Sequence, residues 1–179
     1  MNFSIDPTEA LLRARDVSLL LLDVDGVLTA GELYLSDSGE EIKAFSTLDG
    51  QGIKLLQGAG VKVGILSGRT SALLTRRAAN LGISLLIQGR EDKHTALEEL
   101  CAAQGWHPHQ IAYVGDDLPD IRVMKSVRLA FAVINAHDAV KQVAHVITGR
   151  RGGDGAVREV CDFLLQAQDK YDAALAPYL

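Results

Sequence analysis

The feature of this sequence that most constrains its fold is a series of short, continuous apolar runs separated by segments of helical length. Runs of this kind, rich in Leu, Ile and Val, are typical of strands that are covered on both faces of a parallel sheet. Their alternation with helical segments predicts an α/β fold with a doubly wound, Rossmann-like parallel sheet. The predicted strands are residues 18–23, 62–66, 84–87, 111–114 and 129–133. The predicted helices are residues 51–57, 70–81, 93–104, 118–125, 138–143 and about 156–170.

One segment interrupts this alternation directly after the first predicted strand. Residues 33–35 (LYL) and 40–45 (EEIKAF) flank the turn-forming sequence Ser-Asp-Ser-Gly at 36–39, a pattern that indicates a β-hairpin. We place this hairpin flap at about residues 31–46. The chain has no evident linker or repeat, so we predict a single domain over residues 1–179, with a C-terminal tail at about 148–179.

Charge and hydropathy narrow the range of partners. The net charge of −5 argues against nucleic acid, because phosphate backbones require clustered Lys and Arg. The N-terminus lacks the pattern of a signal peptide, and no apolar run reaches the roughly 18 residues that a membrane span needs. We therefore expect a cytoplasmic protein without a membrane partner, in which Cys101 and Cys161 are reduced thiols.

Polar residues follow three of the predicted strands at the point where each strand ends. Asp23 and Asp25 follow the first, Ser67 follows the second, and Asp116 and Asp117 follow the strand at 111–114. In open α/β sheets, ligands bind at the carboxyl ends of the strands. Carboxylates gathered there repel one another unless a cation lies among them, and hard oxygen ligands favour Mg²⁺. The sequence therefore predicts a magnesium site that includes Asp23 and Asp116.

These residue types suit phosphoryl transfer. A free oxygen of Asp23 can attack phosphorus to form an aspartyl-phosphate, and a bend at Gly26 would let Asp25 serve as general acid and then as base. Ser67 precedes a predicted helix and could hold a phosphate oxygen, while Lys93 could neutralise the transferring group. Each feature alone is common in turns, caps or solvated helix starts. Their order and placement together indicate this chemistry.

Four motifs occur in order along the chain. They are residues 23–29 (DVDGVLT), residues 66–69 (LSGR), Lys93 and residues 115–120 (GDDLPD). With these motifs the chain resembles the haloacid dehalogenase superfamily of Mg²⁺-dependent phosphatases. The resemblance implies that Asp23 is the nucleophile, that Asp25 is the acid/base, and that Lys93 holds phosphate.

The resemblance also implies roles for the residues around them. The Asp23 side chain, the Asp25 backbone carbonyl and Asp116 would bind Mg²⁺, with Asp117 and Asp120 supporting the metal and the lysine from behind. The residues expected to contact substrate are Thr29, Asp49, Ser67, Gly68 and Arg69.

The spacing of the motifs indicates a member without a cap domain. Only 42 residues separate Asp25 from Ser67, and 26 separate Ser67 from Lys93. An open site excludes water poorly, and in capless members of the superfamily a neighbouring subunit covers each site within a tetramer. The resemblance therefore implies a homotetramer in which the hairpin, with its exposed edges, is an assembly element.

From about residue 17 to residue 170, the chain resembles one family in particular, the 3-deoxy-D-manno-octulosonate 8-phosphate phosphatases of lipopolysaccharide precursor synthesis. The substrate of that family is a sugar-acid phosphate. Two departures remove a positive charge that would suit such a substrate: Leu48 replaces the usual Arg, and Asp154 replaces a basic residue. Arg150 and Arg151 lie just upstream and could compensate. The segments that carry the resemblance are residues 22–29, 40–45, 49–53, 112–117 and 152–162.

Three other interpretations stay open. The first is a related phosphatase that acts on a sialic-acid-type 9-phosphate, which the changes at Leu48 and Asp154 would favour. The second is a signalling module that accepts phosphate on an aspartate; Asp25 argues against it, because an acid/base at that position speeds hydrolysis. The third is a catalytically silent relative, which would require a broken motif.

Overall fold

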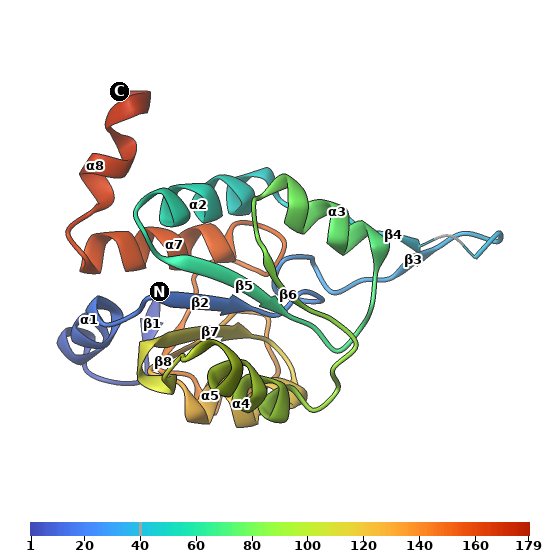
Figure 1. The fold of residues 1–179 in the computed structure, drawn as a ribbon, viewed down its shortest axis with the longest axis horizontal. Helices are drawn as coiled ribbons and strands as arrows, with labels where there is room; N and C mark the ends of the chain where they lie inside the picture. The colour runs from blue at the N-terminus through green and yellow to red at the C-terminus, as the bar shows by residue number, and fades with distance from the viewer. Residues whose placement is uncertain (40) are drawn as a thin grey trace.

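The computed structural model describes residues 1–39 and 41–179 and shows one large sheet between two layers of helices (Figure 1). The sheet has seven strands in the order β1-β9-β8-β7-β2-β5-β6, and all neighbours are parallel except β1 and β9. The prediction of a doubly wound α/β fold is confirmed. The strands are β1 Asn2–Phe3, β2 Leu19–Leu22, β5 Lys62–Leu66, β6 Leu85–Ile87, β7 Ile111–Gly115, β8 Leu129–Ala132 and β9 Val146–Ile147.

The central strands are buried on both faces. Every residue of β2, β7 and β8 is buried, which explains why these segments are apolar without alternation. In the view of Figure 1, α2, α3 and α7 cover one face of the sheet, and α4 and α5 cover the other. The helices are α1 Pro7–Arg15, α2 Thr47–Gly58, α3 Ala72–Asn80, α4 Lys93–Gln104, α5 Ile121–Ser126, α6 Asp138–Val143, α7 Ala156–Ala167 and α8 Tyr171–Leu175, with 3₁₀ turns at Pro108–Gln110, Leu118–Asp120 and Ala176–Tyr178.

The strand order creates a topological switch point beside β2. From β2 the chain moves outward to β5 and β6 and then returns to β7 on the opposite side of β2. Leu22 at the end of β2 is in register with Val114 of β7. The loops that follow these two strands therefore begin side by side, at the position where α/β sheets bind ligands.

The predicted hairpin is present and projects from the body of the molecule (Figure 1). Strand β3 (Tyr34–Leu35) pairs with the antiparallel strand β4 (Glu41–Ile42), and Glu40, which we expected in the second strand, lies outside the described residues. The hairpin exposes apolar side chains: Tyr34 is 56% exposed, Leu35 68% and Ile42 61%.

The largest difference from a predicted helix boundary lies where glycines weaken the helical pattern. Helix α2 begins at Thr47, four residues before the predicted start, and the Ser46 hydroxyl accepts a hydrogen bond from the Asp49 N–H (3.4 Å). Gly50 and Gly52 reduce helix propensity here, but a Cβ at Gly52 would lie only 2.8 Å from Arg158 Cδ of α7. Close packing of α2 on α7 therefore requires a glycine at position 52, although glycine makes the helix harder to predict from the sequence. Within the described residues, no helix is both long and apolar enough to cross a bilayer.

Candidate active site

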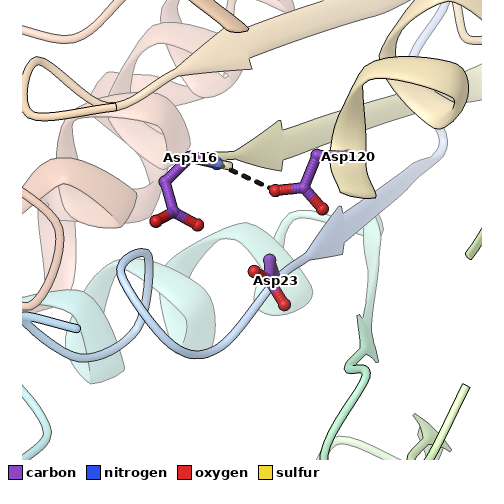
Figure 2. Close-up of side chains that lie close together, drawn as sticks. All are labelled: Asp23, Asp116 and Asp120. Carbon is purple, nitrogen blue, oxygen red and sulfur yellow. Dashed lines mark hydrogen bonds between the residues drawn. The ribbon is translucent and has the colours of Figure 1, made fainter. Parts of the chain in front are cut away.

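Three carboxylates meet at the switch point. Asp23 follows β2, Asp116 follows β7, and Asp120 ends the 3₁₀ turn after β7. Figure 2 shows the three side chains directed toward one another, and a carboxylate oxygen from each lies within 4.8 Å of the others. The backbone holds this arrangement, because the Asp23 N–H donates to the Val114 carbonyl of the neighbouring strand (3.1 Å).

Asp120 organises the cluster. Its fully buried carboxylate accepts hydrogen bonds from Lys93 Nζ and the Tyr113 hydroxyl at Oδ1 (both 2.7 Å). Its Oδ2 accepts from the backbone N–H groups of Asp116 (2.9 Å) and Asp117 (3.2 Å). These four donors occupy the acceptor positions of a carboxylate, so Asp120 is a scaffold for the site and a poor candidate for a metal ligand.

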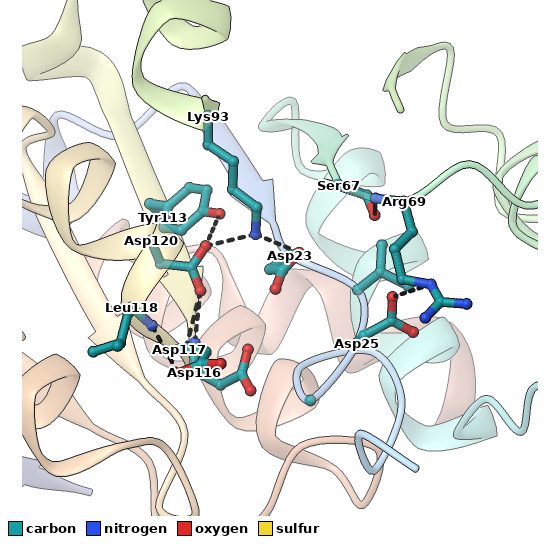
Figure 3. Close-up of polar contacts among 12 residues, drawn as sticks. Asp23, Asp25, Ser67, Arg69, Lys93, Tyr113, Asp116, Asp117, Leu118 and Asp120 are labelled. Carbon is teal, nitrogen blue, oxygen red and sulfur yellow. Dashed lines mark hydrogen bonds and ion pairs between the residues drawn. The ribbon is translucent and has the colours of Figure 1, made fainter. Parts of the chain in front are cut away.

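Lys93 is a buried cation at the centre of the carboxylate cluster. It is the first residue of α4, only 5% exposed, and its ammonium bridges Oδ1 of Asp23 and Oδ1 of Asp120, each at 2.7 Å (Figure 3). Burial alone would lower the pKa of Lys93, but the charges of the two carboxylates outweigh burial and raise the pKa. Lys93 is therefore charged at neutral pH and fixes one oxygen of Asp23.

The electrostatics of the other carboxylates indicate a place for a cation. Burial and the charge of Asp120 raise the pKa of Asp23 to about 6, although Lys93 opposes the shift. Burial and the charges of Asp23 and Asp120 raise the pKa of Asp116 to about 8. Among the described residues, the buried Oδ1 of Asp116 has no hydrogen-bond partner. Asp23 and Asp116 therefore fit a hard divalent cation that would remove this repulsion.

Asp25 contacts the hairpin instead of the carboxylate cluster. Its carboxylate pairs with the Lys43 ammonium, and its Oδ2 lies 3.9 Å from Nε of Arg69. Lys43 and Arg69 also contact Glu41, at 3.2 and 3.3 Å. Sequence reasoning missed Lys43 and Glu41. The available signal was their spacing, because residues two apart on a strand lie on the same face.

A cavity of about 600 Å³ opens over these groups. Ser67, at the end of β5, is 2% exposed and its hydroxyl accepts from the Arg69 N–H (3.2 Å). The structure brings most of the predicted site residues to this one cavity. Its lining comprises Asp23, Asp25, Gly31, Leu33, Ser67, Gly68, Arg69, Glu91, Lys93, Asp116, Asp117, Pro119 and Asp120.

Two residues predicted to contact substrate, Thr29 and Asp49, are not among the residues that line this cavity. Thr29 is 4% exposed; its hydroxyl donates to the Val24 carbonyl (3.3 Å) and accepts from the Gly26 and Gly31 N–H groups (3.3 Å each). Thr29 therefore ties together the loop that carries Asp25. Asp49 is 1% exposed and caps the start of α7, because its carboxylate accepts from the N–H groups of Arg158 (2.8 Å) and Gly155 (3.4 Å).

The glycine-rich segment at residues 152–155 packs on the loop of its own chain that carries Asp25. The Gly153 N–H donates to the Val27 carbonyl (2.9 Å), and the Gly152 N–H donates to Oδ1 of Asn135 (2.9 Å). A Cβ at Gly152 would lie 1.7 Å from the Gly26 carbonyl oxygen, so the two backbones are in direct contact. The tail thus supports the loop that carries Asp25.

The two departures from the family pattern, Leu48 and Asp154, do not line the cavity that contains the carboxylates. Leu48 is 49% exposed and lines a separate hollow of about 470 Å³, together with Arg150 and Arg158. Asp154 lies two residues before the start of α7, and its charge adds to burial in raising the pKa of Asp49.

Comparison with known proteins defines the class first. The family model of haloacid dehalogenase-like hydrolases matches residues 86–160, which include Lys93 and the loop after β7. The 3-deoxy-D-manno-octulosonate 8-phosphate phosphatase of Yersinia pestis is 47% identical over 166 residues, covering 93% of this chain and 89% of that protein. The chain therefore belongs to the 3-deoxy-D-manno-octulosonate 8-phosphate phosphatase family of haloacid dehalogenase-like hydrolases.

Solved structures agree with this assignment. The phosphatase from Moraxella catarrhalis, in complex with magnesium, phosphate and 3-deoxy-D-manno-octulosonate, superposes with a TM-score of 0.95 at 40% identity and covers 97% of this chain and 99% of that one. The cobalt-bound enzyme from Haemophilus influenzae has a TM-score of 0.86 at 41% identity and covers 90% of this chain and 94% of that one.

Proposed function

We propose that this protein hydrolyses 3-deoxy-D-manno-octulosonate 8-phosphate to the free sugar acid and phosphate, with Mg²⁺ as cofactor, in lipopolysaccharide precursor synthesis. The observation that carries the proposal is a buried aspartate, Asp23, which Lys93 holds close to Asp116, whose Oδ1 has no hydrogen-bond partner among the described residues. Family membership supplies the substrate class. The raised pKa values of Asp23 and Asp116 support a cation between them.

The metal would be held by the side chains of Asp23 and Asp116 and by the backbone carbonyl of Asp25. When bound, Mg²⁺ would offset the charge of the carboxylates and stabilise the charge that develops on the phosphoryl group.

The reaction would then proceed in two steps, transfer of the phosphoryl group to Asp23 and hydrolysis of the aspartyl-phosphate. Lys93 orients the Asp23 carboxylate through Oδ1, and one carboxylate oxygen of Asp23 forms a bond to phosphorus while the bond from phosphorus to the sugar oxygen breaks. Asp25 gives its proton to the departing sugar oxygen. Asp25 next takes a proton from water, whose oxygen attacks phosphorus and releases Asp23 with inorganic phosphate. The Ser67 hydroxyl and Lys93 would hold the phosphoryl oxygens during both steps.

We further propose a homotetramer in which the hairpins meet. The apolar side chains of Tyr34, Leu35 and Ile42 support this assembly, because a projecting hairpin with exposed apolar residues gains stability from a partner surface. A cytoplasmic location fits the free thiols of Cys101 and Cys161, since a reducing compartment preserves them.

The proposal is tested by phosphate release across a small panel with Mg²⁺. The panel contains the eight-carbon sugar-acid 8-phosphate, a sialic-acid-type 9-phosphate and the neutral arabinose 5-phosphate. We expect the eight-carbon substrate to lead in kcat/KM by tenfold or more, which corresponds to about 1.4 kcal/mol of transition-state preference. A preference for arabinose 5-phosphate would contradict the proposal, and a preference for the 9-phosphate would favour the related phosphatase.

A further inference from the structure

Four charged side chains join the hairpin to the edge of the cavity. Asp25 and Glu41 supply two carboxylates, and Lys43 and Arg69 supply two cations. Each cation contacts both carboxylates. Lys43 is nearly buried, with 3% of its side chain exposed, whereas 48% of the Arg69 side chain is exposed. The cluster thus has an inner cation and an outer cation that share the Glu41 carboxylate.

The charges that line the cavity make Arg69 important for an anionic substrate. Among the described lining residues, six are carboxylates and two, Lys93 and Arg69, are cations. Lys93 is already held between Asp23 and Asp120. Within the described part of this chain, Arg69 is therefore the lining cation left to bind a carboxylate of the sugar, and its planar donors suit such a group.

Glu41 contacts one nitrogen of that guanidinium. Its Oε1 lies 3.3 Å from Nη2 of Arg69 and 3.2 Å from Nζ of Lys43. Glu41 is not among the lining residues of the cavity, so its carboxylate reaches Arg69 from the hairpin side. An incoming sugar carboxylate and Glu41 would compete for the same donors.

We propose that Glu41 is a specificity-determining residue that stands in for the substrate carboxylate and exchanges with it on binding. The inference rests on the proposed function, because it takes the substrate to be a sugar acid. The exchange weakens binding of every ligand that carries the sugar-acid carboxylate, including the product. Glu41 therefore favours release of the free sugar acid, and it has no such effect on a neutral sugar phosphate.

The test compares wild-type protein with Glu41→Gln. The matched control is Glu9→Gln, which removes the same charge from a carboxylate that pairs with Arg13 on α1, outside the cavity lining. We expect Glu41→Gln to lower KM for the sugar-acid phosphate, and the inhibition constant of the free sugar acid, by about threefold, as for a partly exposed ion pair. KM for arabinose 5-phosphate should stay unchanged, as should every constant of Glu9→Gln.

The variant Arg69→Ala tests whether Glu41 acts by competing for the Arg69 guanidinium. In this background Glu41→Gln should no longer strengthen binding of the free sugar acid, which calorimetric titration measures without turnover. An effect that survives in Arg69→Ala would overturn the proposal, as would equal changes for acidic and neutral substrates or no change for either. Failure of the proposed function is separate, because it would show as a lack of preference for the sugar-acid phosphate in the wild-type protein.

Discussion

Gly152 offers a sharp test of how the tail supports the catalytic loop. In Gly152→Ala, the new Cβ would lie 1.7 Å from the Gly26 carbonyl oxygen, 2.5 Å from its carbon and 3.1 Å from Val27 Cα. All three are backbone atoms, so no side-chain rotation relieves the overlap. A carbon–oxygen contact needs about 3.3 Å, so the loop or the tail must move by about 1.5 Å.

The displacement would reach the reacting groups because the loop also packs against Asp116. Gly26 lies against Asp116, and a Cβ on Gly26 would be 2.0 Å from Asp116 Oδ2. A shift of the loop therefore moves Asp25 relative to the carboxylates. Misplacement of catalytic groups by about 1 Å can cost about 100-fold in rate, and we expect kcat/KM of Gly152→Ala to fall by about that factor. Overpacking should also lower the free energy of unfolding, by about 1–3 kcal/mol.

The assay is phosphate release at saturating Mg²⁺, together with urea denaturation to show that the variant is folded under assay conditions. Gly58→Ala is the control, because Gly58 lies at the end of α2 and a Cβ at this position would have no neighbouring atom within 4 Å. That variant should keep its activity and gain at most about 1 kcal/mol of stability. A folded Gly152→Ala protein with wild-type kcat/KM would refute the reasoning.

Three further predictions concern the nucleophile, the metal and the hairpin. Asp23→Asn should lose at least about 10³-fold in phosphate release, because an amide does not attack phosphorus; near wild-type turnover would exclude Asp23 as nucleophile. EDTA should abolish phosphate release, and added Mg²⁺ should restore it; activity that is indifferent to chelation would exclude the metal. Because the pKa of Asp116 is raised from 3.8 to about 8 on folding, the metal-free protein should lose stability as pH rises between these values, and Mg²⁺ should suppress this loss in urea denaturation; a metal-free stability that rises over this range would contradict the assignment. Deleting residues 31–45 should give monomers or dimers of low activity by light scattering, and an active tetramer would show that the hairpin does not build the assembly.

The strands and the carboxylates that follow them were predictable because local sequence determines both. A strand buried on both faces must be apolar along its whole length, so the first polar residue marks its end. The sequence therefore predicts that Asp23 and Asp116 lie at one edge of the sheet. The position of Lys93 at a helix start was also predictable from local sequence. Asp92 before it caps the helix, because its carboxylate accepts a hydrogen bond from the Thr95 N–H (3.1 Å).

The positions of Thr29 and Asp49 could not be predicted in the same way. Both lie in segments that carry the family resemblance, and their polar side chains suit a ligand. Their actual partners are backbone N–H groups, which Thr29 finds in its own loop and Asp49 finds more than 100 residues away in α7. A buried polar side chain must satisfy its hydrogen bonds, and sequence alone does not identify the donor.

The same long-range contacts bear on how the chain compensates for its departures from the family pattern. Leu48 and Asp154 alter charge around the hollow at the start of α7, whereas Arg69 lies in the cavity that contains Asp23. The loss of charge at these two positions therefore leaves the reacting carboxylates and their lysine intact. On the proposal made above, recognition of the sugar carboxylate would fall to Arg69, and its strength would depend on how firmly Glu41 holds that guanidinium. The flap would then contribute to selectivity through its charges as well as to assembly through its apolar residues.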